Sequence, residues 1–583
     1  MRSAKFATQK YAMHDQGSDV MQRCYLSELR LALVIVAQAA AVLLISTVPA
    51  FAHESQLVEA IVIYASTQEQ ASPSDLPLAG STLAVSEADE QETSNNSEDV
   101  VQDEIHIEAI RSGGQCNCCT KRCCTKVDKR DATKAMKSAY AGVFYANNFS
   151  YLCDPCYTGP SFCGESLKDM KTRFGTISVG GETRFRYHDE RNFRGPNGLT
   201  GNDDSFLLFR QRFYADWQMT DDVRVYGEIL DANSSGENFQ PLINEENDCD
   251  ILNLFVDLKL FECGDTSLIA RIGRQEMLYN SQRTISPLDW SNTRRTFEGV
   301  RTLYQNNGFS LDTFWTRPVQ VNSKGEDRSD EKEDFFGGYA TMKKSDGGSV
   351  AAYYLGYNSD NVSANPILNR DFTFHTIGGR TDGETNGGIL YDFEGAFQFG
   401  KNNDGSDHSA GFVTLGLGRK LDCRAFQPTV WAWYDYASGE KNFADVSIGD
   451  NGYHHLFPLD HKYNGLMDLF GRRNLHDLST QVITPITANV DVLVWYHYLL
   501  LAEDTLPYNL AMVPYNLAGG PALDRELGHE IDVLFNINLS PRDNVLLGYS
   551  HFFGGAYYDP ANIGPANGDK DADFFYAQFQ TRY

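Results

Sequence analysis

The sequence lacks any apolar run after residue 52 that is long enough to cross a membrane as a helix. Its mean hydropathy is −0.39, which argues against a bundle of membrane helices. The same average is compatible with a membrane β-barrel, because polar residues facing a barrel lumen offset the apolar residues that face lipid. Composition therefore leaves two classes open, a soluble β protein and a membrane barrel.

Positive charge is missing from residues 53–110, which contain thirteen Asp and Glu residues and no Lys or Arg. Like charges, serine and few aromatic residues are typical of a disordered segment. We therefore predict an acidic disordered tether over 53–110. Much of the formal net charge of −28 comes from this stretch, so the net charge says little about the rest of the chain.

A basic and then apolar segment precedes the tether. Two arginines come before the apolar run 31–52, which ends in Ala-Phe-Ala. This order is typical of a secretion signal, so we predict a signal peptide over 1–52 with cleavage before His53. A retained membrane anchor is the alternative, and the small residues at the end favour cleavage. The polar stretch before the apolar run is long, which makes Met13 and Met21 alternative start residues.

Cysteine is scarce except in residues 111–165, which hold eight of the 12 cysteines. An exported chain meets an oxidising compartment, so disulfides are the default prediction, with no metal site. Zinc is the alternative, although adjacent cysteine pairs fit a tetrahedral site poorly, and the connectivity does not follow from sequence. We predict a small periplasmic cap or plug with a short helix over 131–145. The disulfide candidates are Cys116, Cys118, Cys119, Cys123, Cys124, Cys153, Cys156 and Cys163.

Tyrosine and phenylalanine are frequent, with 30 and 35 copies, and the apolar residues recur at every second position. In FLLFRQRFYADW (206–217), apolar side chains alternate with Arg, Tyr and Asp. The same split recurs in 529–539 and in 251–260, where Leu252 falls on the apolar face. Period two is the signature of a strand. The chain ends FFYAQFQTRY (574–583), which resembles the terminal assembly signal of bacterial outer-membrane barrels.

Short turns and long links alternate between these strands. The turns TDD, ECGD, NNG, KSDGG and SPRDN are separated by long polar links at about 189–205, 231–250, 274–298, 318–334 and 437–475. Tight turns on one side and long loops on the other are typical of outer-membrane barrels. Roughly 400 residues at about 20–23 per strand and connection give about 16–20 strands, enough for an aqueous lumen. We predict an all-β, transmembrane, antiparallel up-and-down barrel over 176–583, with the N-terminal segment on the periplasmic, short-turn side.

Arginines fall on the polar faces of the predicted strands, and six more concentrate in RIGRQEMLYNSQRTISPLDWSNTRRTFEGVR (271–301). Guanidinium stays charged when partly dehydrated and offers a planar fork to carboxylates. We therefore predict a cationic path through the lumen. Acidic residues on the same faces would stop a polyanion from binding too tightly to leave; bracing of the wall by ion pairs is the alternative. These acidic counter-residues are Glu182, Asp216, Glu228, Asp257 and Glu276.

The stretch 273–301 resembles the signature of alginate-export outer-membrane porins, in which G-R-Q-E, Q-R and D-W-x-N-T-x-R-x-F-[DE]-G recur. GGETRFRY (180–187) is similar to the first strand of that family, and HKYNGLMDLFGRRNL (461–475) to a later loop motif. The resemblance covers about 176–583 and implies a monomeric barrel of about 18 strands with an electropositive constriction. The positions matching that constriction are Arg184, Arg186, Arg210, Arg212, Arg271, Arg274, Arg294 and Arg295, and we add Arg301 from the same stretch.

We expect a conduit for anionic solutes, and the resemblance implies export of an alginate-like acidic polysaccharide. The expected partners are outer-membrane lipid, anionic polysaccharide or small anions, and periplasmic export or envelope components. We expect no cofactor and no nucleic acid, because the basic residues alternate into a lumen.

Two other functions stay open. One is a structural envelope barrel with an ion-paired lumen. The other is a polyuronate-processing enzyme, for which His454, His455 and His461 near Asp460 and Asp468 are candidates. A loop histidine cluster is more often surface or packing, and no G-x-S-x-G motif is present. We therefore predict that the protein is not an enzyme.

Overall fold

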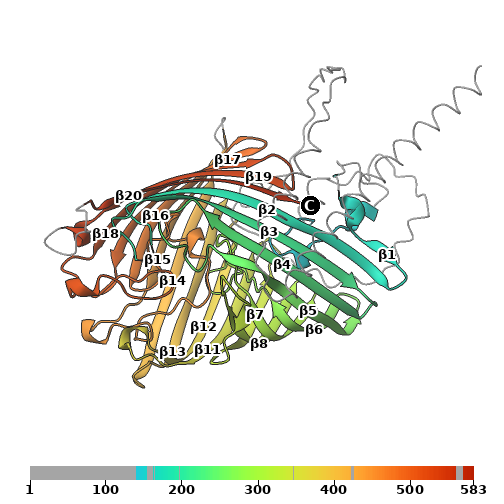
Figure 1. Ribbon diagram of the computed structural model, residues 1–583, viewed down its shortest axis with the longest axis horizontal. Helices are drawn as coiled ribbons and strands as arrows, with labels where there is room; N and C mark the ends of the chain where they lie inside the picture. Colours follow the sequence, from blue (N-terminus) through green and yellow to red (C-terminus); the bar gives the residue numbers. More distant parts are fainter. Residues whose placement is uncertain are drawn as a thin grey trace, which may run out of the picture. The chain divides into compact units, whose positions relative to one another are not determined.

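The computed structural model describes residues 139–153, 162, 164–195, 197–345, 347–421, 426–559 and 569–583. Within them, one sheet of antiparallel strands closes on itself as a barrel of 18 long strands (Figure 1). The all-β barrel prediction is therefore confirmed. The predicted leader, acidic tether and disulfide candidates lie outside the residues whose side chains are described. No helix of the described residues is long and apolar enough to cross a membrane.

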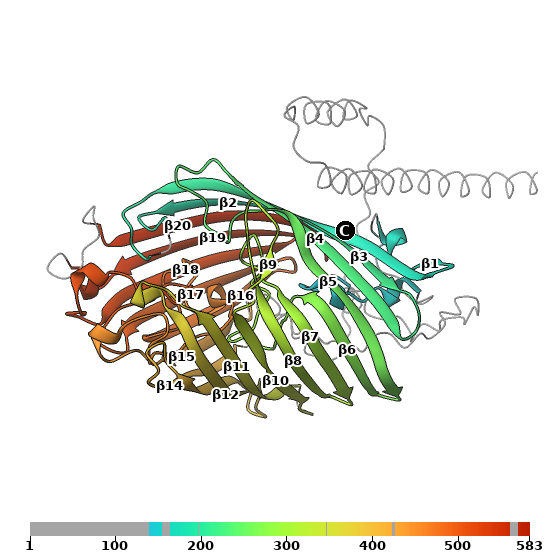
Figure 2. The same ribbon diagram turned by 60° about the horizontal axis from the view of Figure 1, so that its bottom comes forward.

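The long strands follow the chain order around the barrel, each pairing with its sequence neighbour (Figure 2). They are β2 (Gly175–Arg191), β3 (Asp204–Gln218), β4 (Val223–Ser235), β5 (Asn247–Cys263), β6 (Thr266–Gln275), β7 (Phe297–Asn306), β8 (Phe309–Gln320), β10 (Glu333–Lys343), β11 (Ser349–Asn361), β12 (Arg370–Glu384), β13 (Ile389–Lys401), β14 (Asp407–Lys420), β15 (Thr429–Ala437), β16 (Leu475–Thr487), β17 (Val490–Leu501), β18 (Glu526–Asn538), β19 (Asp543–Gly554) and β20 (Asp571–Arg582). Two short strands, β1 (Met170–Thr172) and β9 (Arg328–Ser329), pair with β2 and β8.

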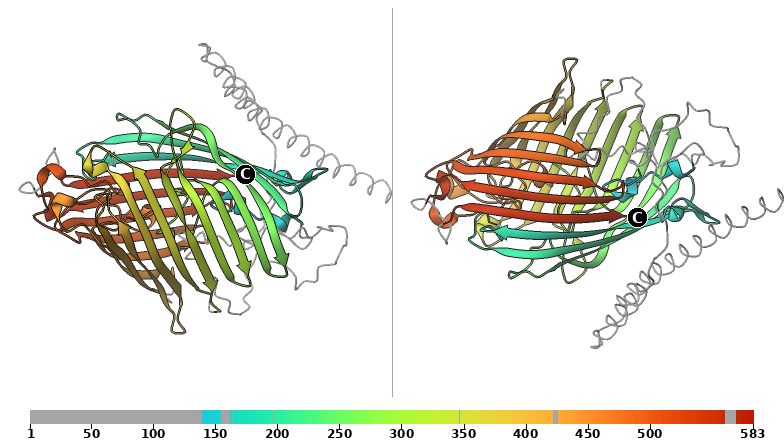
Figure 3. Two further views of the ribbon diagram at one scale, coloured as in Figure 1. Left: turned by 90° about the horizontal axis from the view of Figure 1, so that it is seen from below. Right: turned by 90° about the horizontal axis from the view of Figure 1, so that it is seen from above.

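The first and last long strands close the barrel. β2 pairs with both β3 and β20, and Figure 1 shows it between them. The β1–β2 hairpin, the short turns such as 219–222 and the C-terminal Tyr583 share one end of the barrel, which Figure 3 shows from two sides. Long connections such as 276–296 and 438–474 join the strands at the other end. The predicted alternation of short turns and long links is present.

Alternation along each strand sends apolar side chains outward. Large apolar residues with more than a third of their surface exposed recur on most strands, and a contiguous apolar outer face is the surface that a barrel presents to lipid. Representative members of this outer face are Phe185, Leu207, Ile272, Trp315, Ile377, Phe397, Leu415, Val494, Phe535, Phe575 and Phe579.

The predicted alternation changes phase within β5. Leu252 was expected on the apolar outer face, but it is 6% exposed and packs with Leu230 and Ala232 inside the barrel. The pairing of β4 with β5 shifts between Glu228 and Ile229, so that Leu252 is the extra residue of a bulge. Beyond this extra residue Ile251 lies outward and is 41% exposed, and no local sequence pattern predicted the shift.

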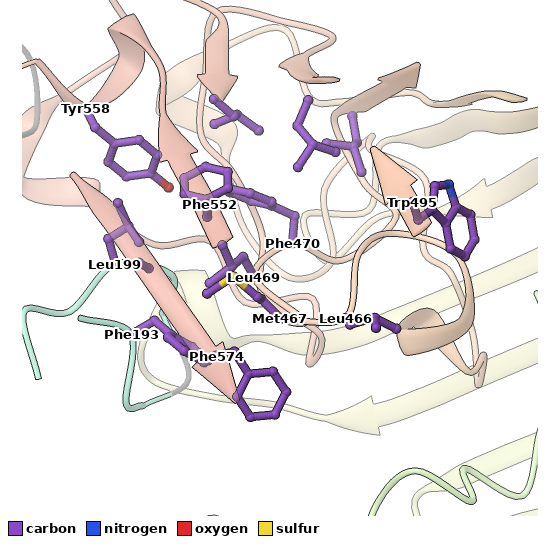
Figure 4. Packing of buried hydrophobic residues seen from close by; sticks show 14 of the residues in the cluster. Phe193, Leu199, Leu466, Met467, Leu469, Phe470, Trp495, Phe552, Tyr558 and Phe574 are labelled. Atoms are coloured by element: carbon purple, nitrogen blue, oxygen red, sulfur yellow. The ribbon is translucent and has the colours of Figure 1, made fainter. Parts of the chain in front are cut away.

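The barrel lumen is packed with loop residues. One cluster joins loop residues Leu466–Phe470 to wall residues including Phe552 and Phe574 (Figure 4). A second joins Ile285 and Phe457, from the two long loops, to wall aromatics of β7–β12. A third joins residues 143–145 to Tyr214, Tyr226 and Phe255. The interior contents therefore come from three separate parts of the chain.

Candidate functional site

The first two long strands place four arginines side by side on the inner wall. Arg184 and Arg186 lie on β2, Arg210 and Arg212 lie on β3, and Arg184 pairs directly with Arg210 in the sheet register. All four are at most 2% exposed. Like charges directly opposite each other destabilise a sheet, so this column requires negative groups close by.

Carboxylates supply part of that charge. Arg210 Nη2 lies 2.7 Å from Glu182 Oε1, and Arg212 Nη2 lies 2.6 Å from Glu228 Oε1. Arg294, from the loop at 276–296, forms a buried ion pair with Glu276. We name this loop the lumen loop. The pairs lie inside the barrel, where solvent screens charges far less than at the surface.

The next strands repeat the arrangement. Asp257 on β5 accepts hydrogen bonds from Arg271 Nε at 2.7 Å and from Arg224 Nη1 at 3.4 Å. Asp216 on β3 binds Arg224 Nε at 2.7 Å. All five acidic residues expected beside the arginines therefore form ion pairs with them. Arg301 on β7 has a partner that was not expected, Asp312 on β8, at 2.5 Å.

Arg184 and Arg186 differ from the other wall arginines. Among the described residues, neither has a carboxylate oxygen within 4.0 Å. Their charge is met instead by neutral oxygens of the lumen loop, which are main-chain carbonyls and the Asn292 side-chain amide, 3.3 Å from Arg184 Nη2. Arg184 Nη1 donates to the Asp289 carbonyl at 2.7 Å and Nη2 to that of Ser291 at 3.1 Å. Arg186 Nη1 donates to the Trp290 carbonyl at 2.7 Å.

Asp289 is the hub of the lumen loop. Its carboxylate lies 2.8 Å from Arg210 Nη2 and also pairs with Arg294. Burial alone would raise the pKa of Asp289, but Arg294 and Arg210 hold it well below its usual value. Asp289 is therefore ionised, and it belongs to the arginine cluster although the sequence analysis did not single it out.

A stacked sandwich fixes the tip of the lumen loop. The Arg186 guanidinium lies 3.8 Å from the Trp290 ring centroid, and His461 stacks on Trp290 with centroids 3.5 Å apart. His461 Nδ1 contacts Asp468 at 3.0 Å, and His455 Nδ1 contacts Asp460 at 2.6 Å. The loop histidines thus pack inside the lumen. Among described residues, no group of three or more His, Cys, Asp or Glu side chains is placed to hold a metal ion.

Two predicted path residues lie apart from this cluster. Arg274 is on the outer side of β6, where its guanidinium donates to the Ile251 carbonyl and lies 3.4 Å from Glu298. Alternation from the inward Arg271 places Arg274 outward, because the two differ by an odd number of residues. Arg295 is inside but donates to the Pro458 carbonyl at 3.0 Å, and burial lowers its pKa to about 10.

A second arginine group was not assigned to the path from the sequence. Arg283 of the lumen loop binds Asp392 at 3.1 Å and Glu394 at 3.0 Å on β13. Arg472 binds Asp435 at 3.0 Å, and Arg473 pairs with Asp450. The three arginines are at most 1% exposed. All three lie in stretches that resemble family motifs, 273–301 and 461–475, and that resemblance was the signal that could have found them.

Comparison with known families gives one match, to the family described as "Alginate export", over residues 176–568. The match spans more than half of the chain and the barrel almost to its last strand. The resemblance seen in 273–301 is thereby confirmed. It identifies an outer-membrane channel of the porin type and not an enzyme. No curated protein matches the chain.

Several solved structures are similar to the barrel. They include Acinetobacter baumannii OccAB1, with 13% identity and a TM-score of 0.48 over 71% of this chain and 99% of that one. Pseudomonas aeruginosa OpdK with vanillate has 11% identity and a TM-score of 0.45 over 70% and 98%. Pseudomonas aeruginosa OccD3 (OpdP) has 13% identity and a TM-score of 0.45 over 72% of this chain and 95% of that one. Because these identities and TM-scores are low, we assign the fold from the strand pairing within this chain and not from these structures.

Proposed function

Because the chain belongs to the alginate export family, we propose that it conducts anionic solutes, and an acidic polysaccharide in particular, along the arginine column. The column starts at Arg184, Arg186 and Arg210 and continues through Arg212 and Arg271. Guanidinium groups recognise carboxylates through paired, charge-assisted hydrogen bonds. A polyuronate carries such a carboxylate on every sugar and can pass from one arginine to the next.

The observation that carries this proposal is that, among the described residues, Arg184 and Arg186 pair with neutral amide oxygens and the Trp290 ring but with no carboxylate. A carbonyl oxygen offers a hydrogen bond but only a partial charge, whereas a carboxylate offers a full one. The two guanidinium groups therefore gain when a substrate carboxylate replaces the Asp289, Trp290 and Ser291 carbonyls. Their neighbours Arg210 and Arg212, which already have carboxylate partners, gain less.

The backbone of the lumen loop supports such a replacement. Asn280, Gln282, Leu288 and Arg294 all have positive φ angles, between 37° and 66°. Left-handed backbone is costly for residues such as Gln, Leu and Arg, by about 1–2 kcal/mol each, and persists only where surrounding contacts hold it; Asn adopts it more readily. Exchanging the contacts to the arginines for substrate would release this strain and so lower the cost of moving the loop.

The test is the change in ion current that oligouronates cause in planar bilayers containing the full-length protein. Arg184→Gln/Arg186→Gln should raise the oligouronate concentration that gives a half-maximal change about tenfold or more, since each charge-assisted hydrogen bond contributes roughly 1.5–3 kcal/mol. The matched control is Arg274→Gln/Arg317→Gln, which removes two charges on the outer side of the wall. Equal half-maximal concentrations for the wild type and for the Arg184/Arg186 variant would disprove the site.

A structural barrel with a braced lumen is the second candidate. It is favoured by the complete pairing of Arg210, Arg212, Arg271 and Arg301 with buried carboxylates and by the loops that fill the interior. This candidate predicts no steady ion current at any salt concentration, with or without oligouronates. Conductance of the purified protein under both conditions therefore separates the two functions before any variant is made.

A further inference from the structure

The described residues just before the barrel run into its lumen instead of away from it. Residues 139–153 contain two short 3-10 turns, η1 (Phe144–Ala146) and η2 (Ser150–Cys153). We name residues 139–153 the plug segment. Figure 3 shows this part of the chain beside the C-terminus, at the end of the barrel with the short turns. Arg582, the last residue of β20, donates to the Tyr140 carbonyl at 2.5 Å.

Aromatic side chains anchor the plug segment to the inner wall. Phe144 is 2% exposed, and its ring centroid lies 5.3 Å from that of Tyr214. The Arg212 guanidinium lies 3.9 Å from the Phe144 ring centroid. Tyr145 is 6% exposed and packs edge-on against Phe255 at 5.5 Å. Burying two aromatic side chains stabilises a contact, so the segment is an integral part of the packed lumen.

Main-chain carbonyls of the plug segment accept hydrogen bonds from arginines inside the barrel. Arg224 Nη2 donates to the Tyr145 carbonyl at 2.7 Å, and Arg294 Nη2 donates to the Gly142 carbonyl at 3.2 Å. With Arg582 on Tyr140, three guanidinium groups bind three plug carbonyls. Two of these arginines lie on the wall and one on the lumen loop. Each of these arginines also pairs with a carboxylate, Arg224 with Asp216, Arg294 with Glu276 and Arg582 with Glu182, so the plug occupies one further acceptor position on each, which an oxygen atom of an anionic ligand would take.

The plug segment also holds the lumen loop in place. The Tyr145 hydroxyl donates to the Glu276 carbonyl at 2.9 Å, at the point where the loop leaves β6. The Arg294 contact to Gly142 fixes the other end of the same loop. Removal of the plug frees both attachments together, so plug and loop form one closing unit.

We propose that the plug segment is a built-in closure of the barrel, and that an anionic polymer opens it by competing for Arg224, Arg294 and Arg582. The closure stands on the contacts of residues 139–153, whereas the opening by a polyanion rests on the proposed function. The ligand class is a polymer with repeated carboxylates, because three separated guanidinium groups must be satisfied at once when the plug leaves. A single small anion replaces only one of the three carbonyls.

The first test compares bilayer conductance of the full-length wild type with that of Phe144→Ala/Tyr145→Ala. The variant removes both aromatic anchors and the hydrogen bond to Glu276, so its conductance should be several-fold higher. The matched control is Ser150→Ala, on an exposed side chain of the same segment. Heat-dependent migration in gels verifies that each barrel is folded. Equal conductance of the variant and the wild type overturns the closure.

A peptide of residues 139–152 provides a second readout. Added to the conducting Phe144/Tyr145 variant, it should restore block, and the peptide with the same two alanines should not. A high-conductance variant without anion selectivity would leave the closure standing and refute the proposed function, so the two failures are distinguishable.

The opening step is tested by hydrogen exchange of the full-length wild type. Oligouronates should speed the exchange of residues 139–153 several-fold, and neutral oligosaccharides of the same length should not. Exchange that is the same with both sugars overturns the competition.

Discussion

At the scale of single residues, the lumen is organised around buried charges that are balanced within a few ångströms. Removing two charges from water costs several kcal/mol per ion, and the attraction between them returns this cost only in good geometry. Such pairs are therefore weak evidence for stability but strong evidence that each partner depends on the other. The Arg301–Asp312 pair, 2.5 Å apart and at most 10% exposed in its side chains, is a clear example.

This dependence predicts a coupled mutant pair. Arg301→Met alone leaves the Asp312 carboxylate buried and unpaired, and Asp312→Leu alone leaves the Arg301 guanidinium buried and unpaired. Each single variant should destabilise the barrel by about 3–5 kcal/mol. The double variant should lose much less than the sum of the two. Urea unfolding of the three proteins in detergent micelles measures the coupling, and additive losses would show that the pair does not act as one unit.

Residue positions on the wall were largely predictable, and loop positions were not. Period two placed Arg184, Arg186, Arg210 and Arg212 on one face, and the structure has them there. The same rule places Arg274 outward, so the family resemblance and the alternation disagreed at that residue. Asp289 could not be found in this way, because its role depends on how an irregular loop folds back over residues more than seventy positions away.

At the scale of elements, close strand approach depends on particular glycines. Gly273 on β6 has a φ of 128°, and a Cβ there would lie 2.2 Å from the Leu254 carbonyl oxygen of β5. Backbone oxygen cannot move aside as a flexible side chain can, and φ in this region strains any other residue. Gly227 on β4 faces no such obstacle, since its nearest neighbour would be a Leu254 methyl group at 3.8 Å.

We therefore expect Gly273→Ala to impair assembly and Gly227→Ala to be tolerated. The measurement is the fraction of folded barrel after outer-membrane insertion or refolding, read from heat-dependent gel migration. Gly273→Ala should fall well below the wild type because the β5–β6 pairing must distort to accept the methyl group. Equal folded fractions for the two variants would contradict this account of β6.

The segment that enters β1 carries a buried lysine. Lys168 Nζ donates to the Val179 carbonyl at 2.6 Å and to the Tyr214 hydroxyl at 3.0 Å. Burial, reinforced by the charge of Arg542, lowers the pKa of Lys168 to about 7 from an ordinary value of 10.5. Between these values the unfolded chain holds a proton that the folded chain has lost, so stability rises with pH across this window.

The prediction is a pH-dependent difference between the wild type and Lys168→Met. As pH is raised from about 6 to about 9, the wild type should gain stability relative to the variant, because only the wild type sheds a buried charge. Urea midpoints of both proteins at the two pH values measure the effect. A difference that stays constant, or that changes in the opposite sense, would contradict the assignment of the shift to Lys168.

The elements themselves were predicted better than their contents. Alternation and turn residues located the strands and the long links, since both are local properties of sequence. The bulge at Leu252 and the inward fold of 276–296 arise from packing between distant segments, and no local pattern carries that information. A short helix expected over 131–145 falls partly outside the described residues, and its described end contains the 3-10 turn η1.

At the scale of the whole molecule, the barrel combines buried ion pairs on its inner wall with an interior that is packed with loop residues. An apolar outer face suits lipid, and an arginine column inside suits anions. The lumen loop, the plug segment and the loop at 438–474 pack against the wall residues inside the barrel. We propose that this is a closed state of an anion conduit, in which Arg184 and Arg186 are held by neutral oxygens of the lumen loop until a polymer with its own carboxylates replaces them.

The most direct measurement is the reversal potential of the Phe144→Ala/Tyr145→Ala variant, in which the plug segment is released, in a planar bilayer under a potassium chloride gradient. An arginine column in the conducting path predicts a potential displaced toward the equilibrium value for chloride, with the displacement reduced when Arg184→Gln/Arg186→Gln is added to this variant. A potential displaced toward the equilibrium value for potassium would contradict the account, because the acidic residues, and not the arginines, would then govern the path.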